Sequence, residues 1–229
     1  MTSNTFRFLR FCCSSFSCFF FVFTVLFNQP SNAGSFDDFF GSIGIDNSQV
    51  IKSLLNKGFD PNTPNEAGET PLILAVNSGS INVVKVLSSA KGIDLDRTNL
   101  NDETPLMLAA ISNKLEIARI LISKGSSVNK TGWTPLHYAA SSGHVEMMKL
   151  LLDKSAYIDA VSPNGTTPLM MASRYGTDRA AKYLVQEGAD LSLKNNLDLT
   201  AIDFAQMKGA NTLVSFLSSE SAKRISNPR

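Results

Sequence analysis

The chain has few of the side chains that catalytic and metal sites require. Its 229 residues include two histidines and three cysteines, and all three cysteines lie within the first 18 residues. The remaining residues therefore cannot form a disulfide with one another. The phosphate-binding loop G-x-x-x-x-G-K-S/T, the dinucleotide unit G-x-G-x-x-G, the zinc motif H-E-x-x-H and the hydrolase motif G-x-S-x-G do not occur. We expect no enzyme, no cofactor and no metal site.

Charge of either sign is also scarce. Charged residues make up 18% of the chain, and its formal net charge is +1. Arg7 and Arg10 are the only charged residues among the first 33, so the remainder carries a net charge of −1. This balance excludes the strongly basic surface typical of nucleic-acid-binding proteins. Because 43% of the residues are hydrophobic, the chain can form a core and is not expected to be disordered.

The N-terminal segment differs in composition from everything that follows it. Arg7 and Arg10 precede a charge-free, Phe-rich run from Phe11 to Phe27, and small residues flank Asn32 at Ser31 and Ala33. This pattern predicts a secretory signal, residues 1–33, with cleavage after Ala33 and a periplasmic or secreted mature protein. The alternative is an uncleaved anchor in the inner membrane, because 17 residues is about the minimum that spans a bilayer.

A short motif recurs along the rest of the chain at spacings of 34, 30, 33 and 33 residues. Threonine at an N-cap accepts a hydrogen bond from a free backbone N–H, and proline at the next position has no N–H to leave unpaired. Each copy therefore predicts a helix start. The copies are Thr70-Pro71-Leu72, Thr104-Pro105-Leu106, Thr134-Pro135-Leu136, Thr167-Pro168-Leu169 and a degenerate Thr200-Ala201-Ile202.

Each predicted helix start leads into a pair of helices. Small residues such as Ala109 and Ala110 follow the motif, and a residue suited to positive φ is then expected to end the first helix. The second helix has apolar residues at helical spacing, as in Val83, Val84, Val86 and Leu87. The residues predicted to end first helices are Gly79, Asn113, Gly143, Gly176 and Gly209, and those predicted to end second helices are Gly58, Gly92, Gly125, Ser155 and Gly188.

The fullest copy, Gly132-Trp133-Thr134-Pro135-Leu136-His137-Tyr138-Ala139-Ala140-Ser141-Ser142-Gly143-His144-Val145-Glu146, resembles the ankyrin consensus. The resemblance implies an all-α ankyrin-repeat solenoid of stacked helix-turn-helix units with short hairpin fingers. Clear repeats are expected at about 65–98, 99–130, 131–160 and 161–194. Capping units are expected at 36–62 and 195–219, which gives an ankyrin domain over 34–219, and a disordered tail is expected at 220–229.

The resemblance also implies a non-enzymatic module that binds another protein through a concave face made of fingers and first helices. We predict a monomer that does not bind nucleic acid and meets a membrane only through an uncleaved leader. Aromatic and arginine side chains are favoured as anchors. Trp133 can instead simply pack on the neighbouring finger, and this alternative stays open. The predicted partner-binding residues are Glu69, Leu100, Glu103, Ile111, Trp133, Arg174 and Tyr175.

The two histidines occupy positions that the ankyrin resemblance makes structural. His137 is expected to tie a helix start to the backbone of the neighbouring finger, and His144 to support the turn between the two helices of a repeat. Catalysis or metal binding is the alternative, but no third ligand accompanies the pair at metal-binding spacing. The residues expected to build the repeat framework are Thr70, Pro71, Thr104, Pro105, Thr134, Pro135, His137, Thr167 and Pro168.

Overall fold

The computed structural model describes residues 32–226, and the chain divides into two units, Met1–Asp37 and Asp38–Arg229. The first unit contributes only the start of one helix to the described range, so the architecture below is that of the second unit. No strand occurs among the described residues. The helices are α2 (Asn32–Gly44), α3 (Ser48–Asn56), α4 (Pro71–Ser78), α5 (Ile81–Leu87), α6 (Pro105–Ile111), α7 (Leu115–Ser123), α8 (Pro135–Ser141), α9 (Val145–Asp153), α10 (Pro168–Arg174), α11 (Asp178–Gln186), α12 (Ala201–Lys208) and α13 (Asn211–Ser226).

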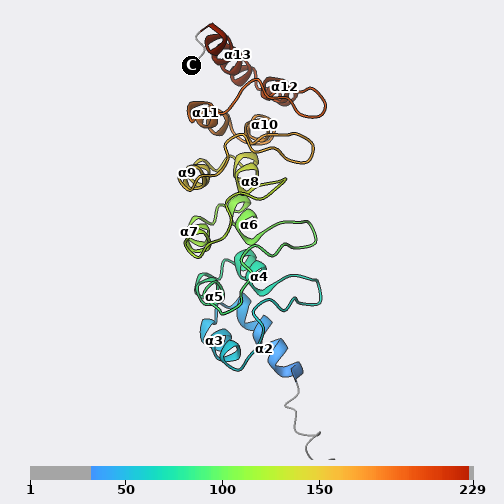
Figure 1. Cartoon of the computed structure of the whole chain (residues 1–229), viewed down its shortest axis with the longest axis vertical. Helices are drawn as coiled ribbons and strands as arrows, with labels where there is room; N and C mark the ends of the chain where they lie inside the picture. The colour runs from blue at the N-terminus through green and yellow to red at the C-terminus, as the bar shows by residue number, and fades with distance from the viewer. Residues whose placement is uncertain (1–31, 227–229) are drawn as a thin grey trace, which may run out of the picture. The chain divides into compact units, whose positions relative to one another are not determined.

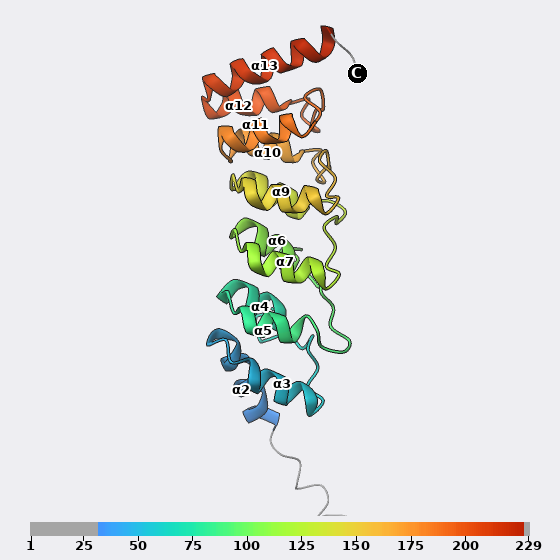
Figure 2. The same ribbon diagram turned by 90° about the vertical axis from the view of Figure 1, so that its left-hand side faces the viewer.

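The helices of the second unit stack as pairs. Figure 1 shows the inner helices α4, α6, α8, α10 and α12 in one row and the outer helices α3, α5, α7, α9 and α11 in a second row. The loops between repeats extend as fingers from the side of the inner helices that faces away from the outer ones. Figure 2 shows successive pairs layered along one axis. This arrangement confirms the predicted all-α solenoid of stacked helix-turn-helix units.

Each inner helix begins at the threonine of the repeated motif. The Thr104 hydroxyl oxygen accepts a hydrogen bond from the backbone N–H of Met107 at 3.2 Å, and Pro105 follows as the first helical residue. These two residues satisfy or remove donors that a bare helix start would leave unpaired. The same hydroxyl contact, at 3.3–3.4 Å, occurs at Thr70, Thr134, Thr167 and Thr200.

Four of the five inner helices have a residue with positive φ at the C-cap or one position after it, and Gly176 differs from the prediction. Gly79, Gly143 and Gly209 have φ between 73° and 76°, and Asn113 has φ 53°. Gly176 is not in the left-handed region. A Cβ atom on Gly176 would lie 2.3 Å from the backbone oxygen of Ala140 on the preceding inner helix. Glycine is therefore needed at position 176 for a close approach between repeats.

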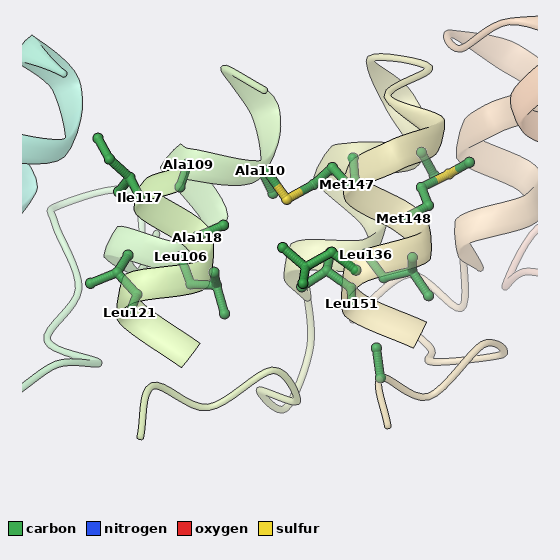
Figure 3. Packing of buried hydrophobic residues seen from close by; sticks show 14 of the residues in the cluster. Leu106, Ala109, Ala110, Ile117, Ala118, Leu121, Leu136, Met147, Met148 and Leu151 are labelled. Atoms are coloured by element: carbon green, nitrogen blue, oxygen red, sulfur yellow. The ribbon is translucent and has the colours of Figure 1, made fainter. Parts of the chain in front are cut away.

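The core lies between the two rows of helices and continues from repeat to repeat. Short side chains on the inner helices let neighbouring helices approach, and longer apolar side chains from the outer helices fill the remaining space. Burial of one large side chain of this kind contributes about 1.5–3 kcal/mol. Figure 3 shows Leu106, Ala109, Ala110, Ile117, Ala118 and Leu121 of one repeat beside Leu136, Met147, Met148 and Leu151 of the next, all of them fully buried or nearly so.

The fingers are tight turns rather than strand pairs. In the second finger the backbone N–H of Asn99 donates to the carbonyl of Glu103 at 3.0 Å, and Asp102 adopts φ 61° to make the turn. The first, fourth and fifth fingers close in the same way, at Asn65–Glu69, Ser162–Thr166 and Asn195–Leu199. Among the described fingers, only the third, residues 129–133, has no such closing bond. It is also the finger that the 30-residue spacing shortens.

A polar ladder joins the finger bases of successive repeats. The Asn62 amide donates to the carbonyl of Gly92 at 2.8 Å and accepts from the backbone N–H of Asp94 at 2.8 Å. Each contact satisfies backbone groups that a loop would otherwise expose. Equivalent contacts join Asp96 to Ser127, Asn129 to Ser155 and Tyr157, and Asp159 to Asp190. Partial burial in this ladder raises the pKa of both Asp96 and Asp159.

The two ends of the stack are closed differently. At the N-terminal end Phe39 is fully buried and stacks on Phe59 with ring centroids 4.1 Å apart. At the C-terminal end, α13 continues to Ser226, so residues 220–226 of the tail predicted to be disordered are helical instead. The Arg224 guanidinium explains this extension because it donates to the carbonyls of Val185 and Ala189 at 2.7 and 2.6 Å.

The predicted leader lies almost entirely outside the described residues. Only Asn32 and Ala33 of segment 1–33 fall within them, at the start of α2. Among the described residues, no helix is both long and apolar enough to cross a membrane.

Candidate functional site

A row of half-buried apolar side chains runs along the inner helices. Each lies four residues after the capping threonine, and the residue three positions further along lies on the same helical face. These side chains pack against the core but keep part of their surface in solvent, which distinguishes them from their fully buried neighbours. We call them the surface row: Leu74, Leu108, Tyr138, Met171 and Phe204.

Tyr138 links the surface row to the fingers. Burial, together with the charge and hydrogen bond of the Glu103 carboxylate, raises the pKa of Tyr138 to about 12. Glu103 also accepts a hydrogen bond from the Asn99 amide at 2.8 Å. The Glu103 carboxylate on the second finger and the Tyr138 phenol on α8 thus influence one another beside the apolar row.

Leu100 and Glu69 occupy adjacent fingers. The Leu100 side chain is 88% exposed, and it lies near Gly68, where a Cβ atom would be 3.7 Å from the leucine. Glu69 is half-buried, and its backbone N–H donates to the Asn65 side chain at 2.8 Å. The finger residues predicted to bind a partner therefore lie close together on the first two fingers, with one large apolar side chain open to solvent.

Trp133 packs within its own repeat, on a buried histidine. Its ring and the His137 ring lie edge to face, with centroids 5.3 Å apart and an interplanar angle of 77°, and Trp133 remains half-buried. One ring nitrogen of His137, Nδ1, lies 2.9 Å from the Thr134 hydroxyl, and Nε2 lies 2.9 Å from the carbonyl of Thr166 on the next finger. Burial lowers the pKa of His137 to about 4. Trp133 thus covers a structural hydrogen-bond network.

Ile111, Arg174 and Tyr175 lie at the C-terminal ends of inner helices. Ile111 is 41% exposed and Tyr175 is 63% exposed, and the Arg174 guanidinium carbon lies 5.4 Å from the centroid of the Tyr175 ring. A cation at this distance from a ring is attracted to its face. Half-buried Arg174 and exposed Tyr175 therefore form a second group, which carries a positive charge.

The predicted residues do not form one patch. Glu69, Leu100 and Glu103 lie on fingers that lead into the N-terminal ends of inner helices, whereas Arg174 and Tyr175 lie at the opposite end of α10. A seven-residue helix separates its two ends by about 10 Å. The surface row connects the two groups.

Sequence reasoning missed the surface row itself. Only its neighbours at the helix ends and on the fingers were selected, although Leu108 and Met171 lie three residues before the selected residues Ile111 and Arg174 on the same helices. The three-residue spacing was the signal that could have found them, because residues i and i+3 share a helical face.

The two histidines make framework hydrogen bonds. His144 Nε2 lies 3.0 Å from the carbonyl of Ile111 at the end of the preceding inner helix, and the His137 contacts reach the next finger. Within residues 32–226, no group of three histidine, cysteine, aspartate or glutamate residues is placed to hold a metal ion.

Comparison with known families agrees with this architecture. A family model described as ankyrin repeats in three copies matches residues 42–99, 91–162 and 155–227, which together span most of the chain. The comparison with curated proteins gave no match.

Three solved structures illustrate the similarity. A chain from the complex of a predatory endopeptidase from Bdellovibrio bacteriovorus with an immunity protein is 30% identical, with a TM-score of 0.68 over 80% of this chain and 97% of that one. The ankyrin repeat domain of Bcl-3, a member of the IkappaB family, is 25% identical, with a TM-score of 0.73 over 80% and 85%. An ankyrin repeat domain from Acinetobacter baumannii AYE is 24% identical, with a TM-score of 0.71 over 81% and 98%.

Proposed function

The chain belongs to the ankyrin-repeat family, and we propose that it is an exported, non-enzymatic module that binds a partner protein through the surface row and the adjoining fingers. The observation that carries this proposal is the continuity of the surface row, since five successive inner helices each leave one large apolar side chain half-exposed at the same position. A row of this kind offers a partner apolar area without disturbing the core.

The surface row contains the side chains that favour tight protein contacts. Burying apolar area contributes about 25 cal/mol per Å², and tyrosine and arginine are enriched among the residues that dominate binding energy. Tyr138 is half-buried against the core, so less side-chain entropy is lost when a partner covers it. We expect Tyr138 and Met171 to form the centre of the interface.

The charges around the surface row favour a partner with a defined orientation. Glu66, Glu69 and Glu103 lie on the first two fingers, whereas Arg174 lies at the far end of α10. Complementary charges steer association and fix its register. The partner is expected to place basic groups against the first two fingers and an acidic group against Arg174.

The comparisons support protein binding as the mode of action. Ankyrin repeats generally serve as non-enzymatic binding scaffolds, and one structure 30% identical to this chain comes from a complex between an endopeptidase and an immunity protein. Both points favour a protein as the ligand of this chain.

The sequence of the leader supports export. Two arginines, a charge-free Phe-rich run and small residues at positions 31 and 33 match a cleavable secretory signal, which would place the module in the periplasm or outside the cell. The alternative is that the leader is retained and the module is a tethered adaptor at the inner membrane. Mass spectrometry of the cell-made protein distinguishes the two: a first residue at Gly34 supports export, and an intact Met1 in the membrane fraction supports the tether.

A photo-crosslinking scan tests the binding face. A photoreactive phenylalanine analogue is placed singly at surface-row positions 108, 138 and 171 and, as matched controls, at exposed outer-helix positions 119 and 149. One partner protein captured from all three surface-row positions and from neither control supports the proposal. Capture of the same partner mainly from the outer positions, or no capture from any position, rejects it.

A further inference from the structure

The outer face of the N-terminal repeats is strongly basic. The outer helices and their following turns, residues 48–58, 81–92 and 115–125, carry a net charge of +5, while the intervening fingers and inner helices, 59–80 and 93–114, carry −5. The corresponding outer segments 145–155 and 178–188 are each neutral. The side of the molecule opposite the surface row is therefore positive in its N-terminal half alone.

A groove between α3 and α5 lies within this basic face. It has a volume of about 420 Å³, and its rim carries Lys52, Lys85 and Lys91. The floor includes the half-buried apolar side chains of Leu55, Phe59 and Val86, and no carboxylate lines the groove. A cationic rim over an apolar floor can accept an anionic ligand that also carries an apolar group.

The floor of the groove is rigid. Phe59 stacks on Phe39, whose ring is fully buried in the core beneath it. Of the rim lysines, Lys85 also pairs with Glu116 on α7 at 3.4 Å, outside the groove. A ligand would therefore meet a preformed floor and would gain most from Lys52 and Lys91.

A second groove on the same face, between α9 and α11, provides an internal comparison. It has a volume of about 530 Å³ and also carries cations, Lys149, Arg179 and Lys182. It differs because Glu146 lines it and lies 3.8 Å from the Arg179 guanidinium. That groove has a carboxylate in its lining, whereas the α3–α5 groove has none and only one of its three lysines, Lys85, is paired with a carboxylate from outside.

We propose that the α3–α5 groove docks an acidic protein segment that inserts an apolar or aromatic side chain between carboxylates. The charge of the rim selects acidic residues, and the recessed apolar floor selects a side chain that reaches inward. A flat layer of lipid headgroups or a phosphate backbone would contact the lysines but would leave the floor exposed to water. This docking surface is separate from the surface row and does not depend on it.

A binding titration with defined probes tests this proposal. The first probe is a fluorescent nine-residue peptide with six carboxylates around a central Phe-Leu pair. The second replaces that pair by two serines, and the third is a phosphatidylglycerol vesicle. Fluorescence anisotropy, or cosedimentation for vesicles, is measured with residues 34–229, with Lys52→Glu/Lys91→Glu, and with the matched control Lys149→Glu/Lys182→Glu. All four lysines are at least partly exposed, and circular dichroism checks that both variants keep the helical fold.

The expected result is binding of the Phe-Leu peptide that weakens about tenfold or more in Lys52→Glu/Lys91→Glu and changes less than about twofold in the control. The serine peptide should bind at least about tenfold more weakly than the Phe-Leu peptide. Absence of binding, equal binding of both peptides, equal loss in both variants, or binding to the vesicles in preference to the peptide would each overturn the proposal. None of these outcomes bears on the crosslinking scan of the surface row.

Discussion

Two adjacent rows on the inner helices behave in opposite ways. Ile73, Met107, His137 and Met170 are at most 1% exposed, whereas the residue that follows each of them belongs to the half-exposed surface row. One step along an α-helix turns the side chain by about 100°. In each repeat a single position therefore separates a side chain that builds the framework from one that is available to a partner. We call the first set the buried row.

The buried row also shows how repeats differ in the way they are tied together. Met107 and Met170 accept a contact from the capping residue's N–H through sulfur, at 3.3 and 3.4 Å. His137 does the same through Nδ1 at 3.2 Å and in addition reaches Thr166 on the next finger. The histidine thus adds a link between repeats that methionine cannot make.

The largest expected effect comes from truncating neighbours in the two rows. Met107→Ala should lower the free energy of unfolding by about 3 kcal/mol, because it leaves a cavity in the core. Leu108→Ala, on the same helix, should cost about 1 kcal/mol because its side chain is partly solvated already. Urea unfolding followed by circular dichroism measures both. Equal losses would show that the two rows are not distinct.

The second largest effect is a loss of stability in acid, which we expect from His137 and not from the methionines of the buried row. Its folded-state pKa of about 4 lies below the ordinary value of 6.5, so the folded state binds the proton less readily than the unfolded chain does. The free energy of unfolding is therefore at its full value above pH 6.5, where both states are neutral, and it decreases as the pH falls towards 4. The loss is about 3 kcal/mol, at 1.36 kcal/mol per pH unit.

His137→Met removes this acid sensitivity and serves as its own test, since the chain already uses methionine at positions 107 and 170. Near pH 7 the variant should be less stable by about 1 kcal/mol, because the hydrogen bond to Thr166 is lost. Near pH 4 it should be the more stable of the two proteins. The free energy of unfolding of both proteins is measured from about pH 7 to pH 4. A constant difference between the two over this range would contradict the assignment of a buried, neutral imidazole.

A smaller effect is expected at the ends of the inner helices. Gly176→Ala should cost about 2 kcal/mol, since the new methyl group would collide with the carbonyl of Ala140 on the adjacent repeat. Gly79→Ala is the matched control: it has open space around it and only the strain of φ 76°, about 1 kcal/mol. Thermal unfolding ranks the two variants. A smaller loss at position 176 than at position 79 would contradict the close approach.

The smallest effect is a gain. Ser155 ends α9 with φ 63°, where the equivalent residue after α7 is Gly125 with φ 104°. Ser155→Gly should stabilise the protein by less than about 1 kcal/mol, because relief of backbone strain is partly offset by the greater freedom of glycine in the unfolded chain. Gly125→Ser is the reciprocal variant and should destabilise by a similar amount. Chemical unfolding midpoints compare them, and a loss on Ser155→Gly would show that no strain is stored there.

Sequence patterns predicted the repeat framework because its determinants are local. The capping threonines, the prolines and most positive-φ residues act within one helical turn, so Thr104 or Gly79 can be interpreted without knowing what packs nearby. Gly176 and Arg224 could not be interpreted in this way. The first is required by the carbonyl of another repeat, and the second reaches carbonyls more than 30 residues away.

The candidate site was predicted less well for the same reason. Trp133 was selected for its chemistry, but its position on His137 depends on where the ring packs. The surface row was missed because half-burial depends on the neighbouring helices, and Tyr138 gains its polar partner from the preceding finger. Composition indicated which side chains can bind a partner, and only the stacking of the repeats determines which of them remain accessible.

The most direct test of the central claim is the dissociation constant of the partner captured from position 138, measured with purified Tyr138→Ala and His137→Met at pH 7 beside the unsubstituted protein. We predict that Tyr138→Ala weakens binding by tenfold or more, about 1.4 kcal/mol, while leaving the fold intact. His137→Met should change the dissociation constant by less than about threefold, although it changes the stability. Unchanged binding by Tyr138→Ala would contradict the assignment of the surface row as the binding face.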